Sequence, residues 1–208
     1  MVVSGSDMDS PVLTAAWPAD SANQNSCLAD ADTSYFFSAD DVKAWFADNG
    51  GVDVTYNDSL VKGSNNTSWT WLRTYHITDS CGNAIDSTLA ISGGDQSAPA
   101  LTGTWPADSI NQNNPLVDAD TTGLIDTDVI AKLFSDCDTV IVTSVDSLDE
   151  NSTNCNWAWI RTYTVQDSTG NIYTIDGHLP YMVVSGSDMD SPVLTAAWPA
   201  DSANQNSC

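Results

Sequence analysis

The first 27 residues of this chain recur without a single change as its last 27. Met1 matches Met182, so the repeating period is 181 residues. Such identity exceeds what a shared fold requires, because folds tolerate extensive substitution. Fixed-period self-similarity is the mark of repeat architectures. We therefore interpret the chain as a window on a longer repetitive protein, in which Met1 is an internal residue.

A second, weaker repeat lies inside the first, at an offset of 88 residues. Trp17-Pro18-Ala19-Asp20 recurs as Trp105-Pro106-Ala107-Asp108. About 90 residues is the size of a small independent domain. The predicted boundaries are 1–4 for the tail of a preceding repeat, 5–92 for repeat A, 93–185 for repeat B and 186–208 for the start of another repeat A.

The formal charge of −23, from 28 acidic and only 5 basic residues, limits the partners of the chain. Nucleic-acid binding needs a basic surface, and so does attraction to an anionic membrane. No apolar run approaches the roughly 20 residues of a membrane helix. We therefore expect no nucleic-acid partner and no membrane insertion within this window. The acidity favours solubility in a salty exterior, or the binding of divalent cations.

Short alternating segments and turn signals predict an all-β fold of tandem immunoglobulin-like β-sandwich domains, each with a short inserted helix. The one helical signal covers 38–46, where Ser38 can cap the first turn and Asn49-Gly50-Gly51 follows the end. In the strand predicted at 69–78, alternate residues share one face. The other predicted strands are 11–14, 52–56 and 85–91, and a turn is predicted at 79–83.

The five cysteines are distributed unequally between the repeats. Repeat A has Cys27 and Cys81, and repeat B has Cys137 and Cys155 at two other positions. Because each pair is present together or absent together, we predict the disulfides Cys27–Cys81 and Cys137–Cys155. Cys208 is the counterpart of Cys27, with a partner beyond the window. Disulfides indicate an oxidising location, extracellular or on the cell surface. Zinc is disfavoured, since no Cys-x-x-Cys pair occurs.

Arg73 and Arg161 interrupt the aromatic face of two equivalent predicted strands. We interpret both as structural, with each guanidinium sandwiched by Trp or Tyr and paired with an aspartate. The alternative is a ligand-binding arginine.

Alternate aspartates suggest calcium as a cofactor, because closely spaced carboxylates can offer oxygens to one hard cation. The alternative is helix capping and solubility, and no complete EF-hand loop occurs. The candidates at the joints between repeats are Asp7, Asp9, Asp95, Asp188 and Asp190, and those in loops are Asp30, Asp32, Asp118 and Asp120.

No catalytic constellation is recognisable. His76 and His178 are isolated, and neither neighbours a serine or cysteine in a nucleophile motif. We predict that the chain is not an enzyme.

The run Arg-Thr-Tyr-x-x-x-Asp-Ser-Cys-Gly-Asn at 73–83, the lead-in at 97–106 and the Asp-Ala-Asp-Thr stretch at 30–33 occur in a fixed order. This set resembles the HYR-like, immunoglobulin-like repeats of giant secreted adhesins of Bacteroidota. The resemblance covers essentially the whole window. It implies a large surface protein exported across the outer membrane, often by the type IX route, with roles in gliding or attachment. It also implies two disulfides per domain, whereas each repeat here keeps one cysteine pair.

Asp-Ser followed by a small or apolar residue recurs along the chain and resembles the O-glycosylation motif of Bacteroidota. The alternative is ordinary turn chemistry, since Asp-Ser is common in turns. The predicted acceptors are Ser21, Ser59, Ser109 and Ser147.

These observations predict a structural repeat of an extracellular adhesin, which forms a stalk or filament on the cell surface. Its expected partners are other copies of the repeat along the chain and neighbouring chains in a fibre. The alternative is a multivalent carbohydrate- or surface-binding module, which the eight tryptophans invite. Their recurrence at equivalent positions favours packing in the core.

Overall fold

The structure is a computed structural model that describes Met1 and residues 5–198. The chain forms two compact units. The first takes in Met1–Thr102, Phe134–Ile141 and Val165–Tyr173, and the second takes in Gly103–Leu133, Val142–Thr164 and the described residues from Thr174 onward. Cys208 and residues 2–4 of the predicted tail lie outside the described residues.

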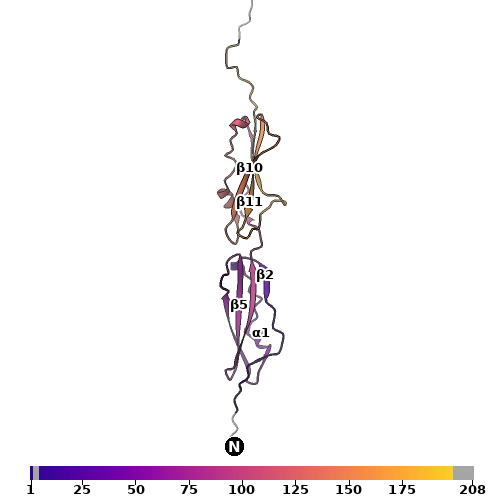
Figure 1. Cartoon of the computed structure of the whole chain (residues 1–208), viewed down its shortest axis with the longest axis vertical. Coiled ribbons are helices and arrows are strands. Elements are labelled where there is room, and N and C mark those ends of the chain that lie inside the picture. The colour runs from indigo at the N-terminus through magenta and orange to yellow at the C-terminus, as the bar shows by residue number, and fades with distance from the viewer. Residues whose placement is uncertain (2–4, 199–208) are drawn as a thin grey trace, which may run out of the picture. The chain divides into compact units, whose positions relative to one another are not determined.

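The predicted fold class is confirmed: the protein is mostly β, with two similar halves that each contain a mixed four-stranded sheet and a short helix. In repeat A the strand order is β2-β6-β5-β4, with β2 parallel to β6 and the other pairs antiparallel. Figure 1 labels β2 and β5 of this sheet. These strands are β2 (Ser21–Asn25), β4 (Val52–Leu60), β5 (Ser68–Asp79) and β6 (Ala84–Gly94). A second sheet pairs β1 (Val12–Leu13) with β3 (Phe46–Ala47).

The core of repeat A forms around β5, the longest strand. Trp69, Tyr75 and Ile77 are all buried, as expected for alternate residues on one face of a strand. The Trp17 ring packs edge-on against Tyr75, with 5.7 Å between centroids. Gly93 is required beside this core, because a Cβ there would lie 2.5 Å from the Trp69 ring.

The helix of repeat A begins with the cap that the sequence predicts. In α1 (Ala39–Lys43), Ser38 Oγ accepts from Asp41 N at 3.2 Å, and Asp41 Oδ2 accepts from Ser38 N at 3.0 Å. This capping box satisfies two backbone donors that the first turn leaves free. Val42, in the same helix, is fully buried in the core. A 3-10 helix, η1 (Leu28–Asp30), precedes it.

Repeat B has the same plan, with the strand order β10-β11-β12-β8. Five additional residues lie between Asn171 and Met182 in comparison with repeat A, because the offset rises from 88 to 93. This longer segment contains a tight turn over Ile175–His178, in which Asp176 and Gly177 have positive φ. The remaining elements are β7 (Ala100–Leu101), β8 (Ser109–Gln112), η2 (Leu116–Asp118), α2 (Thr127–Ala131), β9 (Phe134–Ser135), β10 (Ile141–Leu148), β11 (Asn156–Gln166) and β12 (Tyr181–Ser187).

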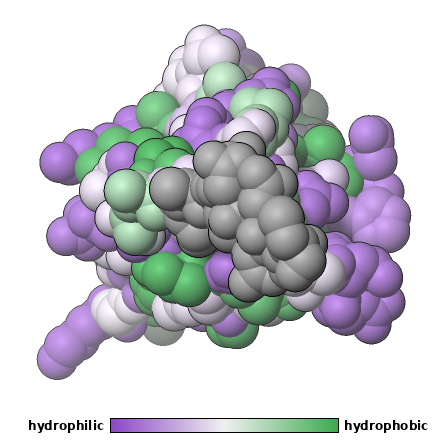
Figure 2. All heavy atoms as spheres, turned by 90° about the horizontal axis from the view of Figure 1, so that it is seen from above, coloured by the Kyte–Doolittle hydropathy of each residue, from purple (hydrophilic) through white to green (hydrophobic). Residues whose placement is uncertain are grey.

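The last strand of each repeat extends two residues past the predicted boundary, to Gly94 in β6 and to Ser187 in β12. On the face that Figure 2 shows, hydrophobic residues appear as small groups among hydrophilic ones. Among the described residues, no helix is long and apolar enough to cross a membrane.

Candidate functional site

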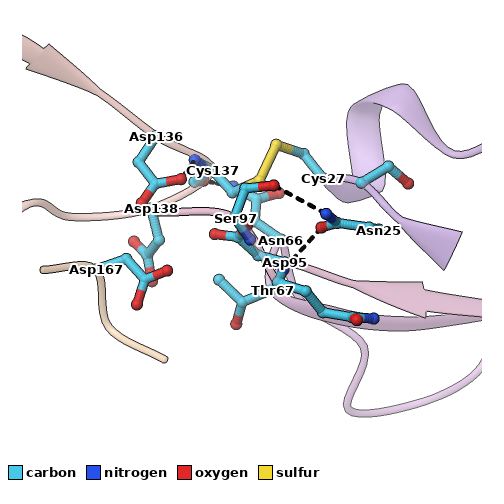
Figure 3. Close-up of a disulfide and its surroundings, with 12 residues drawn as sticks. Asn25, Cys27, Asn66, Thr67, Asp95, Ser97, Asp136, Cys137, Asp138 and Asp167 are labelled. Atoms are coloured by element: carbon cyan, nitrogen blue, oxygen red, sulfur yellow. Dashed lines mark hydrogen bonds between the residues drawn. A yellow bond between two sulfur atoms is a disulfide. The ribbon is translucent and has the colours of Figure 1, made fainter. Parts of the chain in front are cut away.

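A disulfide joins the two sequence repeats. Cys27, between β2 and η1, is bonded to Cys137, which follows β9, with 5.3 Å between the Cα atoms (Figure 3). That Cα separation is ordinary for a disulfide. Both residues belong to the first compact unit, and Asn66 Nδ2 donates to the Cys137 carbonyl at 3.1 Å.

The predicted pair Cys27–Cys81 is therefore wrong, and Cys81 carries a free, exposed thiol. The reason is that β5 separates the two residues. Leu28 N donates to Asn66 O, which places Cys27 near the start of β5, whereas Cys81 follows Asp79 at its end. A strand of 12 residues spans about 40 Å. A disulfide needs Cα atoms within about 7 Å.

The predicted pair Cys137–Cys155 is wrong for the same reason, and Cys155 is also free and exposed. Cys155 directly precedes β11, whereas Asp167 and Ser168 directly follow it. Ser168 Oγ donates to Asp138 Oδ2 at 3.1 Å, so the segment beside Cys137 meets the far end of the strand. The occurrence of two cysteines in each repeat therefore predicted disulfides, but it did not reveal that the partner of Cys27 lies in the other repeat.

The segment that follows β6 is fixed to repeat A by hydrogen bonds. Asp95 N donates to Thr67 O at 3.1 Å, and Ser26 N donates to Gly94 O at 3.1 Å. The Asn25 side chain accepts from Gln96 N at 2.8 Å and donates to Ser97 Oγ at 2.9 Å. Residues 94–97 are therefore an ordered extension of the sheet.

Two carboxylates meet beside the disulfide. A carboxylate oxygen of Asp95, a carboxylate oxygen of Asp136 and the Sγ of Cys137 lie within 4.8 Å of one another. Asp95 is only 7% exposed, and its Oδ2 and that of Asp136 are buried without a hydrogen-bond partner among the described residues. Burial raises the pKa of Asp136, and the charges of Asp95 and Asp167 raise it further. Two carboxylates in this position can share a proton or bind a cation.

Asp167 lies beside this pair but has its own partners. It is 1% exposed, and its oxygens accept from Asn171 N at 2.8 Å, Asn171 Nδ2 at 2.6 Å and Thr169 N at 2.8 Å. Burial acts to raise its pKa, but these hydrogen bonds outweigh burial and hold the pKa below the usual value. Asp79 has the same role and the same shift in repeat A. The repeated Asp-x-x-Gly-Asn turn is the sequence signal for this pair of residues.

Of the cation ligands predicted at the joints, Asp7 and Asp95 lie in clusters of possible ligand atoms, whereas Asp9, Asp188 and Asp190 take part in local hydrogen bonds. Asp7 groups with Asp79 and Cys81, and Asp95 groups with Asp136. Asp9 and Asp190 instead donate their backbone N–H to Asp7 Oδ1 and Asp188 Oδ1, at 3.1 and 3.0 Å. Asp136 was not among the predicted ligands. Calcium at the joints stays a prediction.

The predicted loop ligands are used locally. Asp32 Oδ1 accepts from Ser34 N, and Asp120 Oδ1 accepts from Thr122 N, both at 2.9 Å. These hydrogen bonds hold both pKa values below the usual value. Asp30 and Asp118 end η1 and η2.

The two arginines join β-strands to the segment before each helix. Arg73 binds Asp58 through Nε and Nη2 at 2.6 and 2.7 Å, and its Cζ lies 3.9 Å from the Tyr56 ring centroid and 4.7 Å from that of Phe36. Arg161 binds Asp146 in the same way. Each arginine also donates to backbone carbonyls before its helix, Arg73 to that of Phe37 and Arg161 to those of Leu124 and Ile125. Hydrogen bonds to the aspartates raise the pKa of both arginines.

The predicted glycan acceptors lie on strands, and the aspartate before each one has a structural role. Ser59 and Ser147 are exposed, and Ser21 and Ser109 are half-buried. Asp58 and Asp146 bind the arginines, while Asp20 and Asp108 accept from Ala90 N and Val183 N, both at 2.8 Å. Turn and strand chemistry therefore accounts for the aspartates, and glycosylation stays a prediction.

The second unit contains a hollow of about 470 Å³ that the five-residue insertion helps to form. Trp105 lies at its wall, and its Nε1 donates to Tyr181 O at 3.2 Å. Aromatic and acidic groups line it, a combination that can bind a sugar. The other lining residues with polar side chains are Asp108, Asp176 and His178.

No protein-family model and no curated protein matches this chain. The class of protein is therefore given by the fold and the joint: tandem β domains in which a disulfide connects one sequence repeat to the next.

Proposed function

We propose that this chain is a structural repeat of an extracellular adhesin, which forms a stalk or filament on the cell surface. The observation that carries the proposal is the bond Cys27–Cys137, because it connects consecutive sequence repeats covalently. A covalent bond between consecutive repeats resists their separation under tension, which a stalk or filament has to bear.

Three further observations support the proposal. Each repeat has its own buried tryptophan, Trp69 or Trp157, so every unit added along the chain brings its own core. The segment after β6 is hydrogen-bonded to its repeat and is not a free linker. The disulfide fits an oxidising compartment outside the cytoplasm. Other copies of the repeat are then the principal partners.

Immunogold electron microscopy of the source cells, with an antibody raised against this chain, tests the proposal. Gold along thin surface fibres at a regular spacing is the expected result. Gold in isolated spots, or only in the culture medium, would overturn it. The preimmune antibody is the control.

The hollow beside Trp105 favours a second function, carbohydrate binding by repeat B. Repeat A lacks the Ile175–His178 turn, so its counterpart Trp17 offers a matched comparison. A glycan array should then bind the wild-type chain and the Trp17→Phe variant alike, and bind Trp105→Phe at least tenfold less. Equal binding by all three, or no binding, would remove this function.

A further inference from the structure

Within the described residues, two thiols lie outside the disulfide, and each lies at one end of a repeat. We call the end near Asp7 and Asp79 the leading end of repeat A, and the end near Thr67 and Gly94 its trailing end. In repeat B the trailing end is near Cys155 and Gly186. The bond Cys27–Cys137 involves the trailing end of A and the segment of B beside Asp95.

Cys81 lies at the leading end of repeat A, beside the residue that opens the repeat. Its Sγ lies within 4.8 Å of a carboxylate oxygen of Asp7. Asn83 Nδ2 donates to the Asp7 carbonyl at 3.3 Å, which fixes the turn to the incoming chain. The Cys81 side chain is exposed.

Cys155 lies at the trailing end of repeat B, beside the residue that opens the next repeat A. Its carbonyl accepts from Asp188 N at 3.0 Å, and Asn113 Oδ1 accepts from Met189 N at 2.9 Å. Asp188 is the same residue as Asp7 in the duplicated sequence. Cys155 and the next copy of Cys81 therefore have the same aspartate as a neighbour.

We infer that Cys155 forms a disulfide with the counterpart of Cys81 in the following repeat A. The observed joint supports this assignment. There Asp95 N donates to Thr67 O on one side, and Asp95 groups with Asp136 and Cys137 on the other. Thr67 is the counterpart of Cys155, so both joints bring the same two ends together. The inference rests on the proposed function only in that a second repeat A follows repeat B.

The alternation of cysteines then has a physical reason. Each repeat carries one cysteine at its leading end and one at its trailing end, which are Cys81 and Cys27 in A and Cys137 and Cys155 in B. A repeat needs both of its cysteines because each one bonds at a different joint. The joint from A to B and the joint from B to A use cysteines at different positions of the repeat.

Bond formation is an ordinary thiol–disulfide exchange. A Cys155 thiolate attacks a small-molecule disulfide such as glutathione disulfide, and one glutathione thiol leaves. The thiolate of the second cysteine then attacks the mixed disulfide and releases the other glutathione. The two cysteines lose two electrons and two protons, and the oxidant takes them up as two thiols.

With either bond present, the covalent path along a tandem chain becomes much shorter than its sequence. The bond Cys27–Cys137 alone gives a path that runs through residues 137–208 in each period, and the inferred bond adds a second path of similar length through 27–81 and 137–155. Tension applied to the ends would therefore extend less than half of the 181 residues while the bonds remain.

A chain of two complete periods, in which residues 1–181 are followed by a second copy of 1–181, tests the inference. It is refolded with glutathione disulfide, and its free thiols are counted after denaturation. Each copy contributes Cys27, Cys81, Cys137 and Cys155. Two unpaired thiols are expected, from the first Cys81 and the last Cys155. Four would mean that only Cys27–Cys137 forms.

Mass mapping without reduction identifies the partner. Digestion before aspartates separates Cys137 from Cys155, since Asp138, Asp146 and Asp149 lie between them. The expected product joins the Cys155 peptide to the Cys81 peptide. Cys81→Ser in the second copy should abolish it, and the same change in the first copy should not. A Cys155 peptide joined to any other cysteine would overturn the inference, while the cell-surface test of the stalk would be unaffected.

Discussion

Cys27 and Cys137 are 110 positions apart in the chain, yet their Cα atoms lie 5.3 Å apart. The strands β3, β4, β5 and β6 all lie between them in the sequence. The bond therefore encloses most of repeat A in a covalent loop that ends in repeat B.

Replacement of Cys27 by serine should destabilise repeat A, because the open chain regains the entropy that the loop removes. We expect a loss of about 2–5 kcal/mol in the free energy of unfolding. Urea denaturation without reductant measures it. Cys81→Ser is the matched control and should unfold like the wild type, since Cys81 is not bonded. Equal midpoints for Cys27→Ser and wild type would contradict the bond.

Asp136 should give the first unit a stability that increases as the solution becomes more acidic. Its pKa is raised in the folded state, so the folded chain binds a proton more tightly than the unfolded chain. Stability is gained as pH falls from 7 through the raised pKa, and the gain is complete below the ordinary value of 3.8. Asp136→Asn imitates the protonated acid, so it should raise Tm at pH 7 and flatten this dependence.

Thermal melts at several pH values between 4 and 7 make the comparison, with the exposed Asp53→Asn as the control. Asp79 and Asp167 have lowered pKa values, so their contribution is lost only as pH falls through values below 3.8. An unchanged pH profile in Asp136→Asn would assign the acid dependence to another group.

Calcium should raise Tm if the acid pair is a cation site. Asp95 Oδ2 and Asp136 Oδ2 are buried with no hydrogen-bond partner in the part of the chain that the structure describes, and a bound cation would neutralise both. At a hundredfold excess over Kd, the gain is about 2.7 kcal/mol. The shift should disappear with a chelator and in Asp136→Asn, and it should persist in Asp32→Asn. No shift in the wild type would leave the pair to share a proton.

Arg73→Lys should cost more than Arg161→Lys. Lysine loses the bidentate bond to the aspartate in both repeats, but only Arg73 also packs against the rings of Tyr56 and Phe36. Such stacking contributes about 0.5–2 kcal/mol. Chemical denaturation of the two variants measures the difference. Tyr56→Leu should reduce it, and equal losses for both arginines would show that the rings contribute nothing.

The elements that depend on local chemistry were predictable from the sequence alone. Ser38 and Asp41 cap α1 because both partners lie within four residues of each other. The alternation along β5 placed Trp69, Tyr75 and Ile77 in the core, since a strand has a period of two. The duplicated stretches established the repeats. Most strands were longer than predicted, because their ends are polar.

Other features were decided by the tertiary structure. The strand β2 is polar and mostly exposed, and only pairing with β6 makes it a strand. Likewise, nothing local to Asp136 marks it as the neighbour of Asp95. The pattern of cysteines predicted disulfides, but the choice of Cys137 as the partner of Cys27 depended on how the chain packs. Proximity of residues distant in sequence is a property of the packed chain, and composition and spacing do not determine it.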